Sequence, residues 1–240
     1  MAKDPENLSR FASGSGDGIV KVWDLTRRDE IWHNQAHENI VKGMCWTKDQ
    51  KLLTCAADRS IKMFDPYNTP SGTAPTATWL GSNAFTSLSH HRSKNSFAAA
   101  SGVVSIYDVE RPTAAPEVLK WPTATDTITN VSFNQIETSI LASCATDRSV
   151  VLYDLRTSSE LAKTVLTFAA NSISWNPMYV TLAKCYTSSR PLNRSVTNST
   201  ASTGKHLISH VRAKTTTVSH PPAFKFGKNE YSNMFYSLHI

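Results

Sequence analysis

The sequence predicts an all-β protein built from repeated four-stranded sheets. An aromatic residue followed by aspartate recurs at positions 23, 64, 107 and 153, so that successive copies are separated by 41, 43 and 46 residues. An alternating apolar stretch leads into these pairs, and an Asp-Gly or Asp-Arg turn stands ahead of three of them. A near-constant period of this length indicates stacked units that bury their faces against one another.

Composition sets the broad class of protein. The 240 residues are 40% hydrophobic and 18% charged, which fits one large or two small soluble domains. The four cysteines lie too far apart for a Cys-x-x-Cys pair, and the first 30 residues hold no apolar secretory segment, so we expect free thiols in a reducing compartment. No run approaches the roughly 18 apolar residues of a membrane helix, and no membrane association is expected.

The basic charge of the chain is concentrated in its C-terminal part. Residues 1–178 carry 17 basic and 18 acidic side chains, whereas residues 179–240 carry eight basic side chains and one acidic one. Because nucleic-acid affinity depends on neutralising phosphates, we expect residues 1–178 to bind RNA weakly by themselves. Residues 179–240 are rich in Ser and Thr and show no aromatic-Asp pair, and we expect this basic tail to be disordered.

Each repeated unit is predicted to hold four strands. Opening strands are expected at 40–46, 85–88, 128–133 and 172–175, second strands of small residues at 10–15, 51–56, 96–100 and 140–145, and alternating third strands at 19–23, 60–64 and 149–153. A weaker fourth strand closes each unit. The chain then contains three strands of a first unit, whole units at about 40–82, 84–123 and 127–168, and one opening strand at 170–177.

Aspartates stand six residues ahead of three of the repeated aromatic residues. Aspartate tolerates left-handed backbone and bonds the amides of its own turn, so these residues are expected to form hairpin turns. The hairpin aspartates are Asp17, Asp58 and Asp147, and the repeated aromatic residues are Trp23, Phe64, Tyr107 and Tyr153. The third unit departs from the pattern, with Ser101 at the turn.

Four strands per 40 to 45 residues, ending in aromatic-Asp, resemble the blades of a WD40 β-propeller. The resemblance implies that a histidine ahead of the opening strand bonds the hairpin aspartate. Here His37 stands 21 residues before Asp58, and only the second unit keeps both partners. These residues, the other hairpin aspartates and the four aromatic residues are candidate structural residues of the blades.

Longer strings narrow the resemblance to one family. The sequence contains QAHE at 35–38, HH at 90–91, FNQIET at 133–138, SCATDR at 143–148, VLYDLR at 151–156 and SWNPM at 174–178. Through these strings residues 17–178 resemble the Sof-type WD40 proteins of the small-subunit processome, which in animals are also cullin-four ubiquitin-ligase-associated factors. The resemblance implies an incomplete propeller of about four blades out of seven, truncated at both ends, with blades over 1–178 and a non-homologous tail over 179–240.

The same resemblance implies a non-catalytic scaffold in ribosome biogenesis. Its location would be the nucleolus, its partners would be other processome proteins and the small nucleolar ribonucleoprotein, and its contact with pre-rRNA would be indirect. A second interpretation is a substrate receptor of a cullin-RING ubiquitin ligase, in which Asp154 and Arg156 would dock on the ligase adaptor through the forked Arg side chain. A third interpretation is a non-functional truncated fragment.

Catalytic and ligand-binding motifs are not predicted. The Gly14–Gly18 segment fails the phosphate-loop and nucleophile-elbow patterns and is interpreted as a hairpin turn. The His90-His91 pair lacks further ligands at metal-binding spacing and is interpreted as a polar turn, and the cysteines as small core residues. We therefore expect no enzyme activity, no metal, no cofactor and no small-molecule substrate.

Overall fold

The computed structural model describes residues 1–119, 126–157, 159–167 and 169–175, together with strands at 182–186, 211–212 and 238–239. The expected disorder of the tail falls outside these residues, apart from the three short strands. Within the part of the chain that the structure describes, no helix is long and apolar enough to cross a membrane.

Four antiparallel four-stranded sheets follow one another along the chain, and we call them blades 1 to 4. Blade 1 contains β1 (Ala2–Lys3), β2 (Arg10–Gly14), β3 (Ile19–Asp24) and β4 (Asp29–Gln35), and blade 2 contains β5 (Val41–Trp46), β6 (Leu52–Ala56), β7 (Ser60–Phe64) and β8 (Ala77–Leu80). Blade 3 contains β9 (Ser87–His90), β10 (Ser96–Ala100), β11 (Val104–Asp108) and β12 (Glu117–Leu119), and blade 4 contains β13 (Ile128–Phe133), β14 (Ile140–Ala145), β15 (Ser149–Asp154) and β16 (Ser159–Val165).

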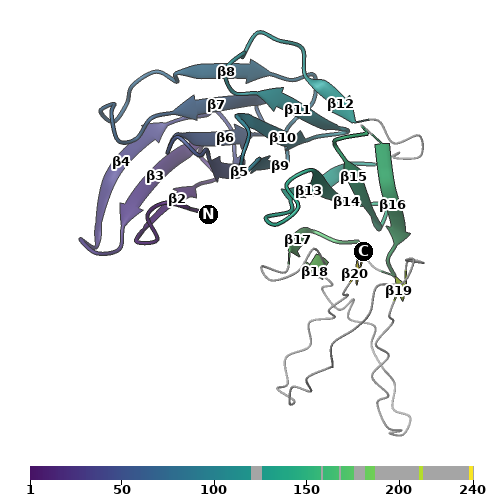
Figure 1. The fold of residues 1–240 in the computed structure, drawn as a ribbon. Coiled ribbons are helices and arrows are strands. Elements are labelled where there is room, and N and C mark those ends of the chain that lie inside the picture. The colour runs from purple at the N-terminus through teal and green to yellow at the C-terminus, as the bar shows by residue number, and fades with distance from the viewer. Residues whose placement is uncertain are drawn as a thin grey trace, which may run out of the picture.

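A fifth sheet follows blade 4. It begins with β17 (Ser172–Trp175), which pairs with β18 (Leu182–Tyr186), and it is completed by β20 (Leu238–His239) and β19 (Val211–Arg212). Figure 1 shows the sheets arranged along an open arc, with β5, β9 and β13 toward its inside and β4, β8 and β16 toward its outside. The all-β, incomplete propeller predicted from the sequence is confirmed.

The strand pattern differs from the sequence prediction in three places, one of which is the pairing of β17 with β18, where only an opening strand was predicted. Blade 1 has four strands rather than three, because Ala2 and Lys3 pair with Ala12 and Phe11 to make a short inner strand. In blade 3 the inner strand begins at Ser87 rather than Phe85. Phe85 instead lies in the turn before the strand, where its ring packs edge-on against Tyr107 at a centroid distance of 6.4 Å.

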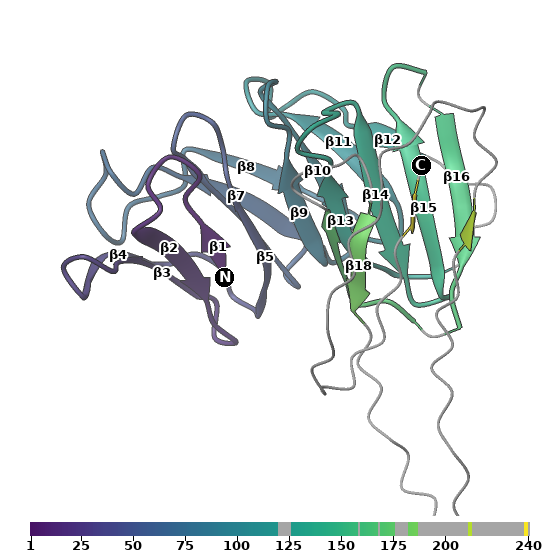
Figure 2. The ribbon, with the colours of Figure 1, turned by 60° about the horizontal axis from the view of Figure 1, so that its bottom comes forward.

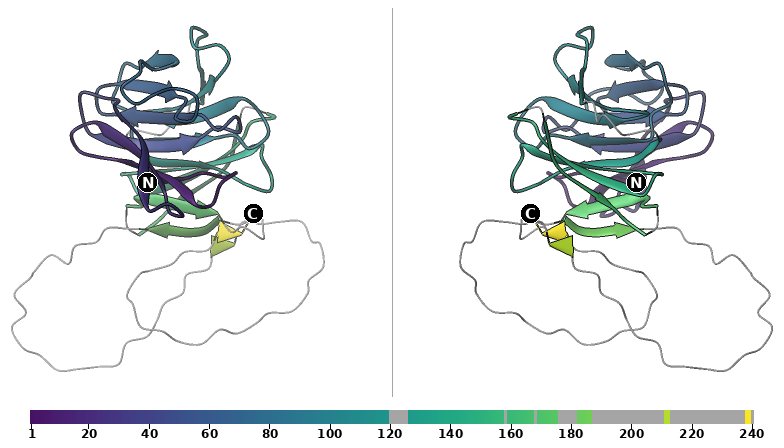
Figure 3. Two further views of the ribbon diagram at one scale, coloured as in Figure 1. Left: turned by 90° about the vertical axis from the view of Figure 1, so that its left-hand side faces the viewer. Right: turned by 90° about the vertical axis from the view of Figure 1, so that its right-hand side faces the viewer.

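The core is divided among the junctions between neighbouring sheets, which stand face to face in Figure 2 and are seen from the sides in Figure 3. One apolar cluster fills each junction, and alternate residues of one strand enter different clusters. In β14, Leu141 packs toward blade 3 whereas Ile140 and Ala142 pack toward β17. This period of two follows from strand geometry, and it means that each blade is stabilised chiefly by its neighbours.

Polar bonds join the inner strands across the junctions. Thr86 donates its hydroxyl to the Ile128 carbonyl at 2.6 Å, and one period later Thr129 donates to the Ala170 carbonyl at 2.7 Å. Asn130 joins both neighbours, because its amide donates to Ser87 and its Oδ1 accepts from the Ile173 amide. These bonds fix the register of neighbouring blades.

Candidate functional site

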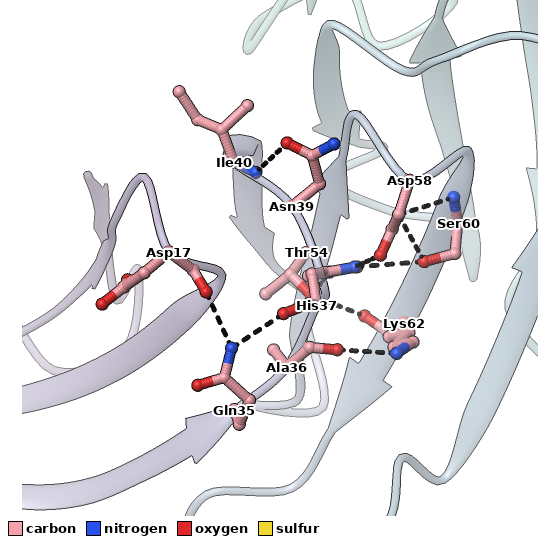
Figure 4. Close-up of polar contacts among 10 residues, drawn as sticks. All are labelled: Asp17, Gln35, Ala36, His37, Asn39, Ile40, Thr54, Asp58, Ser60 and Lys62. Atoms are coloured by element: carbon pink, nitrogen blue, oxygen red, sulfur yellow. Dashed lines mark hydrogen bonds and ion pairs between the residues drawn. The ribbon is translucent and has the colours of Figure 1, made fainter.

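The sequence-predicted histidine and hairpin aspartate of blade 2 meet in one buried cluster (Figure 4). His37 Nδ1 lies 2.8 Å from Asp58 Oδ2 and 3.0 Å from Ser60 Oγ, while His37 Nε2 lies 2.8 Å from Thr54 Oγ1. The His37 side chain is 1% exposed. The cluster therefore connects the turn before β5 to three positions on β6, β7 and the hairpin between them.

The neighbours of His37 determine where its protons lie. A carboxylate can only accept, so Nδ1 carries a hydrogen that it donates to Asp58, and the neutral ring accepts the Thr54 hydroxyl at Nε2. Burial lowers the pKa of His37, and the Asp58 carboxylate opposes this shift without reversing it. Burial also acts to raise the pKa of Asp58, but hydrogen bonds from Ser60 and His37 outweigh it and the pKa is lowered. The pair is thus a neutral imidazole bonded to an ionised carboxylate.

The same cluster fastens blade 1 to blade 2. The His37 amide donates to the Gly18 carbonyl at 3.1 Å, and the Gln35 side-chain amide donates to the carbonyls of both Asp17 and His37. Gly18 has φ +87°, and a Cβ at this position would lie 2.0 Å from the His37 carbonyl oxygen. Only glycine fits this contact, which accounts for the Asp-Gly turn of blade 1.

The remaining hairpin turns lack a histidine. Asp147 accepts the Ser149 amide at 2.9 Å and the Ser149 hydroxyl, and Asp17 accepts the Ser15 hydroxyl and the Ile19 amide. In blade 3 the Ser101 amide donates to the Val103 carbonyl at 3.0 Å. These aspartates act within their own turns, whereas Asp58 also bonds His37, whose backbone amide reaches Gly18 of blade 1.

The aromatic-Asp pairs lie at the ends of the third strands, away from the hairpin turns, and their aspartates hold the turns that follow. The aspartate of each pair accepts a backbone amide from the turn that follows: Thr26 for Asp24, Asn68 for Asp65, Glu110 for Asp108 and Arg156 for Asp154. Three of the aromatic rings, Phe64, Tyr107 and Tyr153, are buried in the junction clusters. Trp23 is half-buried and donates its indole hydrogen to Ser13 at 2.8 Å.

The proposed adaptor-docking residues lie in the turn between β15 and β16. The Arg156 side chain is 64% exposed and grips Asp154 with two bonds, from Nε at 3.1 Å and from Nη2 at 3.0 Å. Hydrogen bonds from the side chain and amide of Arg156 lower the pKa of Asp154. The guanidinium is therefore accessible, but the fork that would recognise a partner carboxylate faces its own aspartate.

A periodic polar residue that the sequence analysis missed ends each inner strand. Asp4, Thr47, His91 and Asn134 recur every 43 or 44 residues, and each is no more than 2% exposed. Each accepts backbone amides of the following turn; His91 Nδ1, for example, accepts from Ser93 and Lys94. The regular spacing is visible in the sequence, but four chemically different side chains conceal it.

His90 and the cysteines show no reactive setting. Burial, with a smaller contribution from His91, lowers the pKa of His90 to about 4. Burial raises the pKa of Cys45 to about 12 and that of Cys144 to about 11, so both are protonated thiols at neutral pH. Among the described residues no group of three or more His, Cys, Asp or Glu side chains is arranged to hold a metal ion.

Comparison with known proteins agrees with this geometry. The family model for the WD domain, G-beta repeat, matches residues 5–24 and 29–65, which cover β2–β7. The chain carries WD40 repeats and is similar to the Sof1 proteins. It is 42% identical to Protein sof1 of Schizosaccharomyces pombe over 178 residues, which is 74% of this chain and 39% of that protein.

Two other relatives align over the same share of this WD40-repeat chain. DDB1- and CUL4-associated factor 13 of Xenopus tropicalis is 38% identical over 181 residues, covering 74% of this chain and 40% of that protein. Protein SOF1 of Saccharomyces cerevisiae is 34% identical over 203 residues, covering 74% and 41%. The chain spans about 40% of the length of the curated relatives it matches.

Proposed function

We propose that this protein is a non-catalytic WD40 scaffold of ribosome biogenesis, a nucleolar component of the small-subunit processome that acts in pre-rRNA processing and 18S rRNA maturation. The observation that carries the proposal is the similarity to the Sof1 proteins over 74% of this chain. The geometry supports a scaffold. The faces of the strands pack into the junction clusters, and the turns, whose backbone is held by hydrogen bonds, can contact partners.

The proposed partners are other processome proteins and the small nucleolar ribonucleoprotein. Residues 1–178 have nearly equal numbers of basic and acidic side chains, so they provide little of the counterion release that drives RNA affinity. Contact with pre-rRNA is therefore assigned mainly to those partners.

Depletion of the native protein tests this proposal. Loss of 18S rRNA with accumulation of its uncleaved precursors, while the large-subunit rRNA is retained, is the expected result, together with cosedimentation of the tagged protein with large ribonucleoprotein particles. Re-expression of the wild-type chain is the control. Equal loss of both subunit rRNAs, or normal 18S rRNA after depletion, would contradict the proposal, and the latter result would favour a non-functional fragment.

A second candidate function is a substrate receptor of a cullin-RING ubiquitin ligase. Two observations favour it: the exposed Arg156 at the end of blade 4 and the relatives named DDB1- and CUL4-associated factor 13. An Arg side chain suits docking through its bidentate fork, but here the fork would first have to leave Asp154.

Arg156→Ala separates the two functions. If the ligase adaptor docks here, the variant loses adaptor pull-down and retains 18S rRNA maturation. Arg27→Ala is a matched control, because Arg27 is an exposed arginine in the corresponding turn of blade 1. Unchanged pull-down by Arg156→Ala would remove this motif from the receptor hypothesis.

A further inference from the structure

A surface groove of about 600 Å³ lies where the turn between β5 and β6 meets the edge of blade 3. Lys48 comes from that turn of blade 2, and Lys94 and Asn95 come from the turn between β9 and β10. Tyr107 and Arg111 line the groove from β11 and the loop that follows it. Two neighbouring blades therefore contribute to one concave surface, which is within the usual size range of a binding site.

The carboxylates of the groove already have partners. Asp108 accepts the Glu110 amide at 2.8 Å and lies 3.7 Å from Arg111 Nε. Glu110 accepts the Asn95 amide at 2.7 Å. By contrast, Lys48 and Lys94 are exposed and form no ion pair with the described residues. The two ammonium groups are thus available to an acidic ligand.

Asn95 fixes the Glu110 carboxylate at the edge of the groove, because its side-chain amide donates to Glu110 at 2.7 Å. Ile106, Tyr107, Ala114 and Ala115 give the rest of the groove an apolar lining.

We propose that this groove binds an acidic segment of a partner protein in extended conformation. A peptide supplies carboxylates for the two lysines and an apolar side chain for the alanine-lined part. A phosphodiester backbone would satisfy the lysines but has no apolar side chain. The inference rests on the proposed scaffold function and specifies the chemistry of one partner.

Fluorescence polarisation of the purified full chain tests the groove. The probe is a fluorescein-labelled octapeptide that alternates aspartate with leucine, and the comparison ligands are an octapeptide that alternates asparagine with leucine and an eight-nucleotide oligouridine RNA. The double variant Lys48→Glu, Lys94→Glu reverses the charge of both lysines and is expected to weaken binding of the acidic peptide about tenfold. The matched control, Lys3→Glu with Lys42→Glu, makes the same change in net charge elsewhere and should leave binding unchanged.

Equal losses in both double variants, absence of peptide binding, or tighter binding of the RNA would overturn the proposal. The scaffold function is measured separately, by 18S rRNA maturation in depleted cells. If the wild-type chain and the Lys48→Glu, Lys94→Glu variant restore maturation equally, the proposed role of the groove is contradicted and the proposed scaffold function is retained. If neither chain restores maturation, the proposed scaffold function is contradicted.

Discussion

Blades 2 and 4 have the same strand order but hold their turns in different ways. Blade 2 uses His37, Asp58, Thr54 and Ser60 in one buried network that reaches back to blade 1. In blade 4 the corresponding aspartate, Asp147, bonds only within its own turn to Ser149. Both blades hold the hairpin turn with an aspartate. The histidine that links this turn to the preceding blade is present in blade 2 and absent from blade 4.

The second strands of the two blades are packed alike. All five residues of β6 and all six residues of β14 are buried, and apolar residues of each strand enter the clusters on both sides of its blade. In blade 4, Thr129 and Asn130 also bond the neighbouring sheets through side chains. Blade 4 therefore adds bonds along its inner strand to this packing, whereas blade 2 adds the His37 network.

The largest expected effect comes from His37→Ala. The change removes one buried partner from each of Asp58 and Thr54 and opens a cavity, so we expect a loss of about 3 kcal/mol in the free energy of unfolding. Chemical denaturation measures the loss, and hydrogen exchange should locate it in β6 and β7. Exchange that accelerates equally in blade 4 would show that the network does not act locally.

A matched pair of aspartate substitutions sharpens the comparison. Asp58→Ala removes bonds to His37 and Ser60 and is expected to cost about 2 kcal/mol, whereas Asp147→Ala removes only turn bonds and is expected to cost about 1 kcal/mol. Denaturation of the two variants side by side measures the difference. Equal costs would mean that the histidine adds nothing to the turn.

Low pH should weaken blade 2 before blade 4. Because the pKa of His37 is lowered by burial, the unfolded chain binds a proton below about pH 6.5 that the folded chain refuses. Its stabilising contribution is complete above that pH and is lost as the pH falls toward the folded-state value, by at most about 1.4 kcal/mol per pH unit. Asp58, whose pKa is also lowered, keeps its contribution until the pH falls below its ordinary value of 3.8.

Hydrogen exchange at pH 7.5 and pH 5.5 measures this dependence, after correction for the intrinsic exchange rates. The protection of β6 and β7 should decrease relative to that of β14 and β15. His90 and His91 of blade 3 also have lowered pKa values and contribute to the same loss. A His37→Ala chain, which lacks one of these groups, should show a shallower dependence; an unchanged slope would remove His37 from the explanation.

Much of the fold was predictable because strand periodicity and turn chemistry are local. The strands β7, β10, β13, β14 and β17 begin and end where the sequence pattern placed them. The inner strand of blade 1 was not predictable, because two residues carry no periodicity and β1 depends on pairing with β2. The buried turn acceptors were missed for a related reason: Asp4, Thr47, His91 and Asn134 share a geometry and not a side-chain type.

The candidate sites show the same limit. Spacing alone paired His37 with Asp58, because the hairpin and the preceding turn are parts of one repeat. The groove at Lys48 and Lys94 combines turns from two blades, and the two lysines are 46 residues apart in the sequence. Only the packing of blade 2 against blade 3 brings these groups together, and no local pattern in the sequence encodes it.

The smallest expected effect is a gain in thermal stability, obtained by placing in blade 4 the histidine that blade 2 has. Asp126 stands 21 residues before Asp147, the same separation as between His37 and Asp58, and Ser143 and Ser149 occupy the positions of Thr54 and Ser60. Blade 4 therefore has the aspartate and the two hydroxyls of the network, and it has exposed Asp126 in place of the histidine. Asp126→His is expected to raise the midpoint of thermal unfolding by about 2 °C, because the imidazole can donate to Asp147. Asp126→Asn removes the charge without adding an imidazole, so an equal rise in both variants would assign the gain to loss of the carboxylate. A larger rise for histidine, lost again in the Asp147→Ala background, would show that the network can be rebuilt in a second blade.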